Sequence, residues 1–252
     1  MSPALLSILV IFVYMSSWWV LSVVTKRADI ADVAWGGGFT LLAWVLYISY
    51  FGGTSLVLAL LVSLWGARLS IHIFLRNSKK KKEDGRYANW RKKWGENWRI
   101  KSYLEVFLLQ GFFMFLIAIP IILSTGKQFE LSSLAIMGVL IFLFGLVFEA
   151  VSDWQVFRFK SNGGKGVFDR GLWRYSRHPN YFGEVTLWWG IALLSFSQTA
   201  NLAVFLGSAT ISILILFVSG IPLLEKRYKD DVSYKKYAKK TSIFFPLPPK
   251  SR

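Results

Sequence analysis

Residues 171–190 read GLWRYSRHPNYFGEVTLWWG and place basic, acidic and amide side chains directly beside an apolar run. Charged groups are costly in lipid, so beside a membrane span they usually form a site or pair with one another. Pro179 disfavours helix at the preceding His178 and can itself begin a helix, which predicts a turn followed by a helix. Asn180 and Glu184, four residues apart, then lie on one face of that helix.

The rest of the chain is too apolar for an ordinary soluble domain. Of its 252 residues, 54% are hydrophobic, whereas soluble domains average roughly 45–50%. The absence of cysteine excludes a disulfide framework, a thiolate nucleophile and a Cys-ligated metal. The formal net charge is +16, and most of the basic residues lie in connections between apolar segments. The charge is therefore expected to set the membrane topology and to meet lipid headgroups or a phosphate-bearing ligand rather than nucleic acid.

Seven segments approach the roughly 20 apolar residues that an α-helix needs to cross a bilayer. They are spread evenly along the chain with no soluble block between them, so we expect a single domain, residues 1–252. The sequence therefore predicts an all-α fold, an integral membrane bundle of seven transmembrane helices. The predicted spans are about 2–24, 33–51, 54–75, 103–123, 132–154, 181–197 and 201–223.

Lysine and arginine residues are concentrated in alternate connections between these spans. The loops 76–102 and 155–180 and the tail 224–252 hold most of them, whereas the intervening short turns hold only Lys127. Basic loops stay on the cytoplasmic side of a membrane, so the N-terminus is predicted outside and the C-terminus in the cytoplasm. We therefore expect a multi-pass protein whose basic loops meet anionic membrane lipids.

Two pairs of ionisable residues lie inside predicted spans at a spacing of four, so each pair shares a helix face. Arg68 and His72 form one pair, and Glu149 and Asp153 form the other. The two carboxylates repel each other unless a cation or a hydrogen-bond donor lies between them. Such a partner could be Arg68, His72, Arg174 or Arg177. A structural network and a ligand contact both stay open. Asp32, at the start of the second span, either caps that helix or donates a proton.

The loop at residues 159–171, FKSNGGKGVFDRG, is rich in glycine and carries Lys160 and Lys165. A flexible basic segment of this kind can bring its backbone close to a phosphate. It lacks the spacing of a Walker P-loop, and no strand precedes it as in a Rossmann fingerprint. Any nucleotide must therefore be held by a different architecture.

Several blocks together resemble the steroid 5α-reductase C-terminal family, in particular its bacterial membrane proteins. The blocks are GLWRYSRHPNYFGE at 171–184, DVAWGGGF at 32–39, ARLSIHIFLRN at 67–77, EDGRY at 83–87 and EAVSDWQVFRFK at 149–160. The resemblance covers most of the chain. It implies a seven-helix bundle that holds NADPH in a cytoplasm-facing cavity and reduces an activated carbon–carbon double bond in a lipid-like substrate. It also favours a bacterial inner membrane over the endoplasmic reticulum, with no obligatory protein partner.

The resemblance implies a set of site residues. Steroid reductases place cofactor contacts at the positions of Asn77, Asp153, Asn180 and Glu184, and Arg86, Lys160 and Tyr228 are looser matches. The glutamate and tyrosine that polarise the steroid carbonyl have no clear counterpart in spans two and three. We expect catalytic roles for Asp32, Arg68 and His72 and no metal site. The further expected cofactor contacts are Asp84, Tyr87, Glu149, Lys165, Tyr175, Arg177, His178 and Tyr181.

Two other functions stay open. Isoprenylcysteine and phospholipid methyltransferases, which use S-adenosylmethionine, have a similar RHPxY turn and a charged segment after the last helix, here LEKRY at 224–228. Those enzymes favour a Gly-Pro-Tyr lead-in and paired glutamates after the last span, whereas this chain has Gly171-Leu172-Trp173 and the single Glu225. The third possibility is a non-catalytic lipid-binding protein whose charges form only a structural network.

Overall fold

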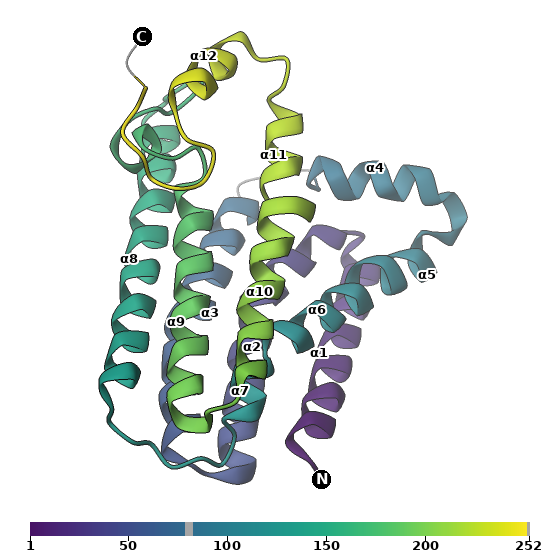
Figure 1. Cartoon of the computed structure of the whole chain (residues 1–252). Coiled ribbons are helices and arrows are strands. Elements are labelled where there is room, and N and C mark those ends of the chain that lie inside the picture. Colours follow the sequence, from purple (N-terminus) through teal and green to yellow (C-terminus); the bar gives the residue numbers. More distant parts are fainter. Residues whose placement is uncertain (79–82, 251–252) are drawn as a thin grey trace. The chain divides into compact units, whose positions relative to one another are not determined.

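The fold is all-helical over the residues that the computed structural model describes, 1–78 and 83–250 (Figure 1). In this part of the chain no β-strand forms, and an isolated parallel bridge joins Ser176 to Ser242. The all-α class is therefore confirmed for these residues, while the lysine run 79–82 of the predicted loop 76–102 lies outside them. The elements are α1 (Pro3–Thr25), η1 (Ala28–Ile30), α2 (Ala31–Tyr50), α3 (Gly53–Ser78), α4 (Gly85–Trp94), η2 (Gly95–Asn97), α5 (Trp98–Ser102), η3 (Tyr103–Leu108), α6 (Leu109–Ile117), α7 (Ile119–Leu123), α8 (Ser133–Ser161), η4 (Gly171–Arg174), α9 (Pro179–Thr199), η5 (Leu202–Val204), α10 (Phe205–Ile213), η6 (Leu214–Val218), α11 (Ile221–Arg227) and α12 (Val232–Lys240).

Six helical segments of the described chain are long and apolar enough to cross a membrane, which supports an integral multi-pass protein. The predicted span 181–197 is helical as well, within α9, but it is not among the six, and it carries Glu184 and several serines and threonines. The count of seven spans and the orientation of the termini stay predictions. The six segments are Pro3–Thr25, Ala28–Tyr50, Gly53–Asn77, Gly85–Ile117, Ser133–Ser161 and Leu202–Arg227.

The chain folds as two compact units. Unit 1 comprises Met1–Leu131 with Gln198–Leu206, and unit 2 comprises Ser132–Ser197 with Gly207–Arg252. The expectation of a single domain stays a prediction.

In unit 1, α2 and α3 pack through two small residues that face each other. A Cβ atom added at Gly36 would lie 2.5 Å from the Gly66 carbonyl oxygen, so the two backbones are in direct contact there. Beside this contact the fully buried rings of Phe39 and Trp65 pack edge to face with centroids 5.6 Å apart. Close backbone approach through small residues is the usual way membrane helices gain packing energy.

The predicted basic loop 76–102 contains two helices, α4 and α5, which were not predicted from the sequence. Asp84 begins α4 as its N-cap, because its carboxylate accepts a hydrogen bond from the Arg86 backbone N–H. Gly95, with a left-handed φ of 55°, ends α4. Helix then continues from α5 through η3 into α6, so the predicted span 103–123 begins inside a longer helical segment. The high density of charge in 76–102 concealed this helix-forming sequence.

In unit 2, α8 and α9 are antiparallel and touch along a glycine seam, defined here as Gly138, Gly145, Gly183 and Gly190. The glycines are seven residues apart on each helix, so both members of a pair lie on the same face. A Cβ at Gly183 would lie 2.7 Å from the Gly145 carbonyl oxygen, and one at Gly190 would lie 2.7 Å from the Gly138 carbonyl oxygen. No side chain fits between the two backbones along this seam.

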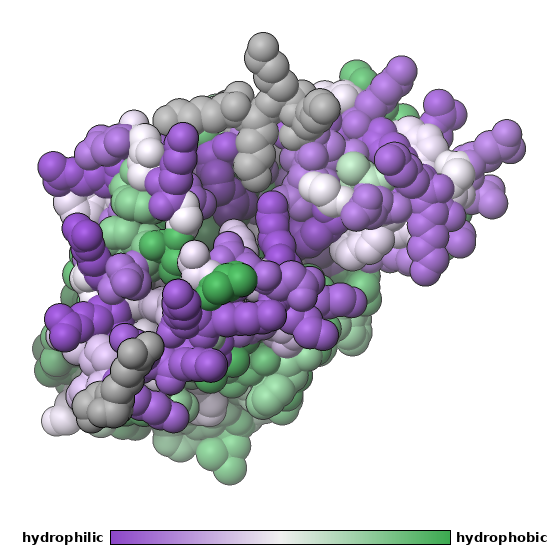
Figure 2. Space-filling view, turned by 90° about the horizontal axis from the view of Figure 1, so that it is seen from above, coloured by the Kyte–Doolittle hydropathy of each residue, from purple (hydrophilic) through white to green (hydrophobic). Residues whose placement is uncertain are grey.

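Outside these contacts, the long helices present apolar side chains to the surroundings. On α1 the exposed residues include Leu5, Ile8 and Phe12, and on α8 they include Leu140 and Phe144. Hydrophilic residues instead dominate the face of the molecule shown in Figure 2, with hydrophobic residues along the margin of that view. This distribution is typical of helices that face lipid along their length and water at an end.

We predict that Gly183→Ala destabilises the protein, because its Cβ would come 2.6 Å from the Glu149 backbone nitrogen. Overpacking of this kind costs about 1–3 kcal/mol, and for a chain of this size each kcal/mol lowers Tm by about 2–4 °C. Thermal unfolding in detergent measures the shift. The control is Gly85→Ala, where an added Cβ meets no atom within 4 Å; equal shifts for the two variants would contradict the prediction.

Candidate functional site

The stretch 171–190 forms a turn and a helix start, as the sequence predicts. The chain passes through the 3-10 turn η4, and α9 begins at Pro179. His178 is only 3% exposed, and its ring stacks on Tyr181 with centroids 5.8 Å apart. Its backbone N–H donates to the Ser176 hydroxyl at 3.1 Å. The polar turn is therefore an ordered structure that presents its side chains in fixed positions.

The carboxylate of Glu225, on α11, contacts the basic side chains of this turn. Arg177 Nη1 donates to one oxygen of Glu225 at 2.6 Å, and His178 Nε2 lies 2.8 Å from the other. The Tyr234 hydroxyl also donates to Glu225, at 2.5 Å. From the sequence, Arg177 was one of several possible partners for the α8 carboxylates and an expected cofactor contact. Its pairing with Glu225 was not predicted, because 48 residues separate the two.

Residues that follow α11 bind the backbone of the same turn, and we call residues 234–247 the tail clamp. Ser242 accepts from the Arg177 backbone N–H at 2.8 Å, and Phe244 accepts from the Ser176 hydroxyl at 2.7 Å. Leu247 N–H donates to the Tyr175 carbonyl at 3.0 Å. No motif in the sequence pointed to these contacts, in which backbone groups of the tail meet backbone groups and the Ser176 hydroxyl of the turn.

Burial raises the pKa of the Tyr234 hydroxyl above its ordinary range, and the hydrogen bond to Glu225 acts in the same direction. Burial likewise raises the pKa of Tyr237, whose hydroxyl donates to backbone carbonyls of the turn, including that of Ser176 at 3.2 Å. Both phenols therefore stay protonated hydrogen-bond donors at neutral pH.

Beside the turn, the α8 carboxylates meet the first turn of α9. The Asn180 side-chain amide donates to Asp153 Oδ1 at 3.2 Å, so two residues predicted as cofactor contacts are brought together. Glu149 is 2% exposed, and its backbone nitrogen faces Gly183 across the glycine seam. Glu184 is half-buried on α9. These residues form a short polar band at the end of the seam.

The glycine-rich loop is folded back on the end of α8, whereas the sequence analysis treated it as a flexible segment. The Gln155 side chain accepts from the Leu172 N–H at 3.0 Å, and the Trp173 indole donates to the Ser152 carbonyl at 3.0 Å. Lys160 lies on the last turn of α8 and Lys165 lies in the loop, and both are exposed. The two ammonium groups can therefore reach an anion, but the loop ends are fixed.

Two open hollows lie on unit 2. One, of about 390 Å³, lies where the glycine-rich loop meets α8 and is lined by Trp154, Arg158 and Phe168 among others. The other, of about 490 Å³, is lined by Glu225, three lysines and the rings of Tyr228 and Tyr234, which stack with centroids 5.2 Å apart. Tyr175 and Tyr228 are both exposed.

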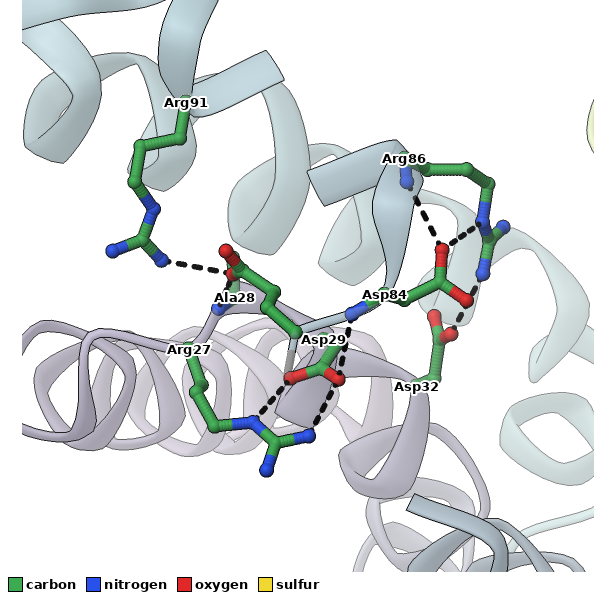
Figure 3. Close-up of polar contacts among 8 residues, drawn as sticks. Arg27, Ala28, Asp29, Asp32, Asp84, Arg86 and Arg91 are labelled. Carbon is green, nitrogen blue, oxygen red and sulfur yellow. Dashed lines mark hydrogen bonds and ion pairs between the residues drawn. The ribbon is translucent and has the colours of Figure 1, made fainter. Parts of the chain in front are cut away.

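In unit 1 the structure gathers a second set of charged residues, drawn in Figure 3. Asp32 lies in the first turn of α2, and the N-cap of that helix is Ile30, so the capping role considered for Asp32 is wrong. Instead Asp32 accepts from the Tyr87 hydroxyl at 2.6 Å and from Arg86 Nη2 at 3.0 Å. Arg86 also donates to Asp84 through Nε at 3.2 Å. Four predicted site residues thus meet in one cluster, which we call the Asp32–Tyr87 cluster.

A buried carboxylate that the sequence analysis did not single out supports this cluster. Asp29 is fully buried and accepts two hydrogen bonds from Arg27, at 3.0 and 2.8 Å, and one from the Asp84 N–H at 3.2 Å. Glu83 accepts from the Ala28 N–H at 2.6 Å and from Arg91 at 2.8 Å. These bonds hold the residues before α4 against the entry to α2.

The three α3 residues of the prediction also belong to unit 1. Arg68 and His72 are half-buried on α3, one turn apart. Asn77 is 7% exposed, and its amide oxygen has no hydrogen-bond partner among the described residues. The predicted meeting of Arg68 and His72 with Glu149 and Asp153, which belong to unit 2, stays a prediction. Over the described residues, no group of three histidine, aspartate or glutamate side chains could hold a metal ion.

We predict that the hydroxyl of Tyr234 stabilises the protein below pH 10 and loses this effect in alkali. An unfolded tyrosine ionises near pH 10, whereas the folded pKa of Tyr234 is raised. Above pH 10 the unfolded state alone releases the proton, so stability falls as pH rises. The Tm difference between wild type and Tyr234→Phe, measured from pH 8 to 11, should therefore shrink above pH 10.

The control for this experiment is Asn89→Ala, at an exposed residue whose side chain does not ionise. This variant should differ from wild type by the same Tm at every pH. A Tyr234→Phe difference that stays constant up to pH 11 would count against the raised pKa.

Comparison with known proteins gives a family and a distant relative. An uncharacterized protein of Schizosaccharomyces pombe is 24% identical over 279 aligned positions, which cover 97% of this chain and 80% of the relative. No solved structure shows significant similarity to the chain. The family model described as "Protein of unknown function (DUF1295)" matches residues 18–241, which include both charged clusters. The chain therefore belongs to the DUF1295 family.

Proposed function

We propose that this protein is a membrane-embedded, NADPH-dependent reductase of an activated carbon–carbon double bond in a lipid-like substrate. The observation that carries the proposal is the hydrogen bond between the Tyr87 hydroxyl and Asp32. Reduction of an enone needs a group that stabilises negative charge on the substrate oxygen, and a phenol held by a carboxylate is such a group. The resemblance to steroid 5α-reductases supports the same reaction class.

The residues of unit 2 fit the polar groups of a dinucleotide. Phosphates need cations, and Lys160 and Lys165 are exposed beside the glycine-rich loop. Ribose hydroxyls and a carboxamide need paired donors and acceptors, which Asp153 and Asn180 provide. In unit 1 the buried amide oxygen of Asn77, which has no partner among the described residues, suits an N–H or O–H group of a ligand. Surplus basic groups favour NADPH over NADH, because of its additional phosphate.

In this proposal bound NADPH supplies the hydride. Arg86 pairs with Asp32 at 3.0 Å, and Asp32 holds the Tyr87 hydroxyl in one orientation. When a substrate oxygen arrives, the Tyr87 O–H would turn from Asp32 to that oxygen and donate a hydrogen bond, which stabilises the negative charge that develops there. The proton that completes the reduction would be taken up from water. Tyr87 is 3% exposed, so little bulk water competes for this donor.

A methyltransferase is the competing function, because its relatives share the RHPxY turn and use acidic residues after the last helix. Here both oxygens of Glu225 are bound to Arg177, His178 and Tyr234. That carboxylate holds the turn in place, and it is the single glutamate after the last predicted span, where the methyltransferases favour two. We therefore keep S-adenosylmethionine as a competitor ligand in the test, and the non-catalytic lipid-binding protein as its negative outcome. The proposed setting is a bacterial inner membrane, without an obligatory protein partner.

We predict that NADPH stabilises the purified protein in detergent more than NADH or S-adenosylmethionine does. A ligand at 100 times its Kd adds about 2.7 kcal/mol to the free energy of unfolding, which corresponds to a Tm increase of about 5–10 °C. Asn180→Ala and Asp153→Asn should each weaken NADPH binding at least tenfold. The control Asn89→Ala, an exposed residue on α4, should bind as wild type does. Stabilisation by S-adenosylmethionine alone would favour the methyltransferase, and stabilisation by none would remove the proposal.

We also predict that Tyr87→Phe lowers turnover of a lipid enone, such as a steroid 4-en-3-one, by about 10²–10³-fold, the usual effect of removing one oxyanion donor. In this proposal Tyr87 contacts the substrate and not the cofactor, which differs from the sequence expectation, so NADPH affinity should change less than threefold. Oxidation of NADPH in the presence of the enone measures turnover. If Tyr87→Phe retains full turnover, the Asp32–Tyr87 cluster is structural and another donor must act.

A further inference from the structure

The segment from Gly85 to Ser102, comprising α4, η2 and α5, carries two tryptophans on α4 that the reaction above does not use, Trp90 and Trp94. Tyr87, Trp90 and Trp94 are spaced at i, i+3 and i+7, so they share one side of α4. Their rings are in series, with centroids 5.3 Å apart for the first pair and 6.0 Å for the second. Tyr87 is buried, Trp90 is 39% exposed and Trp94 is half-buried, so both tryptophans reach the protein surface.

The same segment carries a strong excess of positive charge. It contains one acidic residue, Glu96, and six basic residues, namely Arg86, Arg91, Lys92, Lys93, Arg99 and Lys101. Arg86 and Arg91 are used internally, in ion pairs with Asp32, Asp84 and Glu83. Lys92 and Lys93 on α4 and Lys101 on α5 are exposed. At about 100° of rotation per residue, Lys92 lies on the side of α4 opposite Trp90 and Trp94, and Lys93 lies between the two sides. A helix that is aromatic on one side and basic on the other is typical of a membrane surface.

The position of the segment in unit 1 agrees with such a surface. Its α5 runs without interruption into η3 and α6, which belong to an apolar segment long enough to cross a membrane. Gly95, with φ of 55°, separates α4 from that continuous helix, and Figure 1 shows α4 running across the direction of α1. The segment is attached to the end of α1, because the Trp19 indole donates to the Arg99 carbonyl at 3.1 Å.

The segment is also held in one shape, as a binding surface requires. The Arg91 guanidinium lies 4.4 Å from the centre of the Trp98 ring and pairs with Glu83 at 2.8 Å. These contacts link α4, α5 and the residues before α4. Further along, Ile100 is 64% exposed, which adds an apolar side chain at the point where the helix turns toward the span.

From these observations we propose that Gly85–Ser102 is an interfacial segment that binds anionic phospholipid. Trp90, Trp94 and Ile100 lie at the boundary between headgroups and acyl chains, where tryptophan is enriched. The ammonium groups of Lys92 and Lys93 attract the lipid phosphate, and neighbouring anionic headgroups strengthen this attraction. The occupant is a membrane lipid, and the inference does not depend on the proposed reaction.

Native mass spectrometry of the whole protein in detergent tests the proposal. Added phosphatidylglycerol should give higher lipid occupancy than phosphatidylcholine, and Lys92→Glu with Lys93→Glu should lower phosphatidylglycerol occupancy at least fivefold. Trp90→Ala should lower occupancy by both lipids. An excess of glycerol 3-phosphate should not compete, because the acyl chains contribute to binding.

The matched control reverses two exposed lysines of α12, as Lys235→Glu with Lys236→Glu, which makes the same change in net charge. This variant should keep wild-type phosphatidylglycerol occupancy. Equal occupancy by the two lipids in wild type, or an equal loss in both double variants, would overturn the proposal. Competition by glycerol 3-phosphate would overturn it too, since the site would then bind a free phosphate.

Discussion

Backbone contact between α8 and α9 is the constraint on which the rest of unit 2 depends. Because the glycine seam leaves no room for side chains, the two helices cannot slide or rotate against each other without a steric clash. Beyond the seam, the same register brings Asp153 to Asn180. The polar band therefore occupies a position that apolar packing determines, and its weak individual hydrogen bonds do not have to hold the helices together.

Charge neutralisation follows a common plan in both units. Asp29 is fully buried and accepts three hydrogen bonds, two of them from Arg27. The Glu225 carboxylate likewise lies within hydrogen-bond distance of three side chains, those of Arg177, His178 and Tyr234. Burial of a single unpaired carboxylate would be strongly destabilising, so each acidic group is surrounded by several donors. In both units these donors come from segments that flank a long helix, which fixes the flanking segments at the helix ends.

The sequence predicted the helical class, the apolar segments and the helix start at Pro179, because these depend on composition and on local backbone preference. It did not predict which charged residues pair with one another in the two clusters. The meeting of Asp32 with Tyr87 and of Arg177 with Glu225 depends on how distant segments pack, which local patterns do not contain. The tail clamp combines backbone groups with hydroxyls such as that of Tyr237, and no local pattern shows which distant carbonyl each one meets. The helices within 76–102 were not predicted, because the basic residues there were assigned only to a loop between spans.

The tail clamp also bears on the order in which the protein is made. The Ser176 hydroxyl binds the carbonyl of Phe244, which is 68 residues later in the chain. At the usual 5–20 residues per second, synthesis of those residues takes roughly 3–14 s. During this interval the turn exists without its partners. A nascent chain interrupted before residue 225 would lack the carboxylate that meets Arg177 and His178, so the turn reaches its final arrangement only at the end of synthesis.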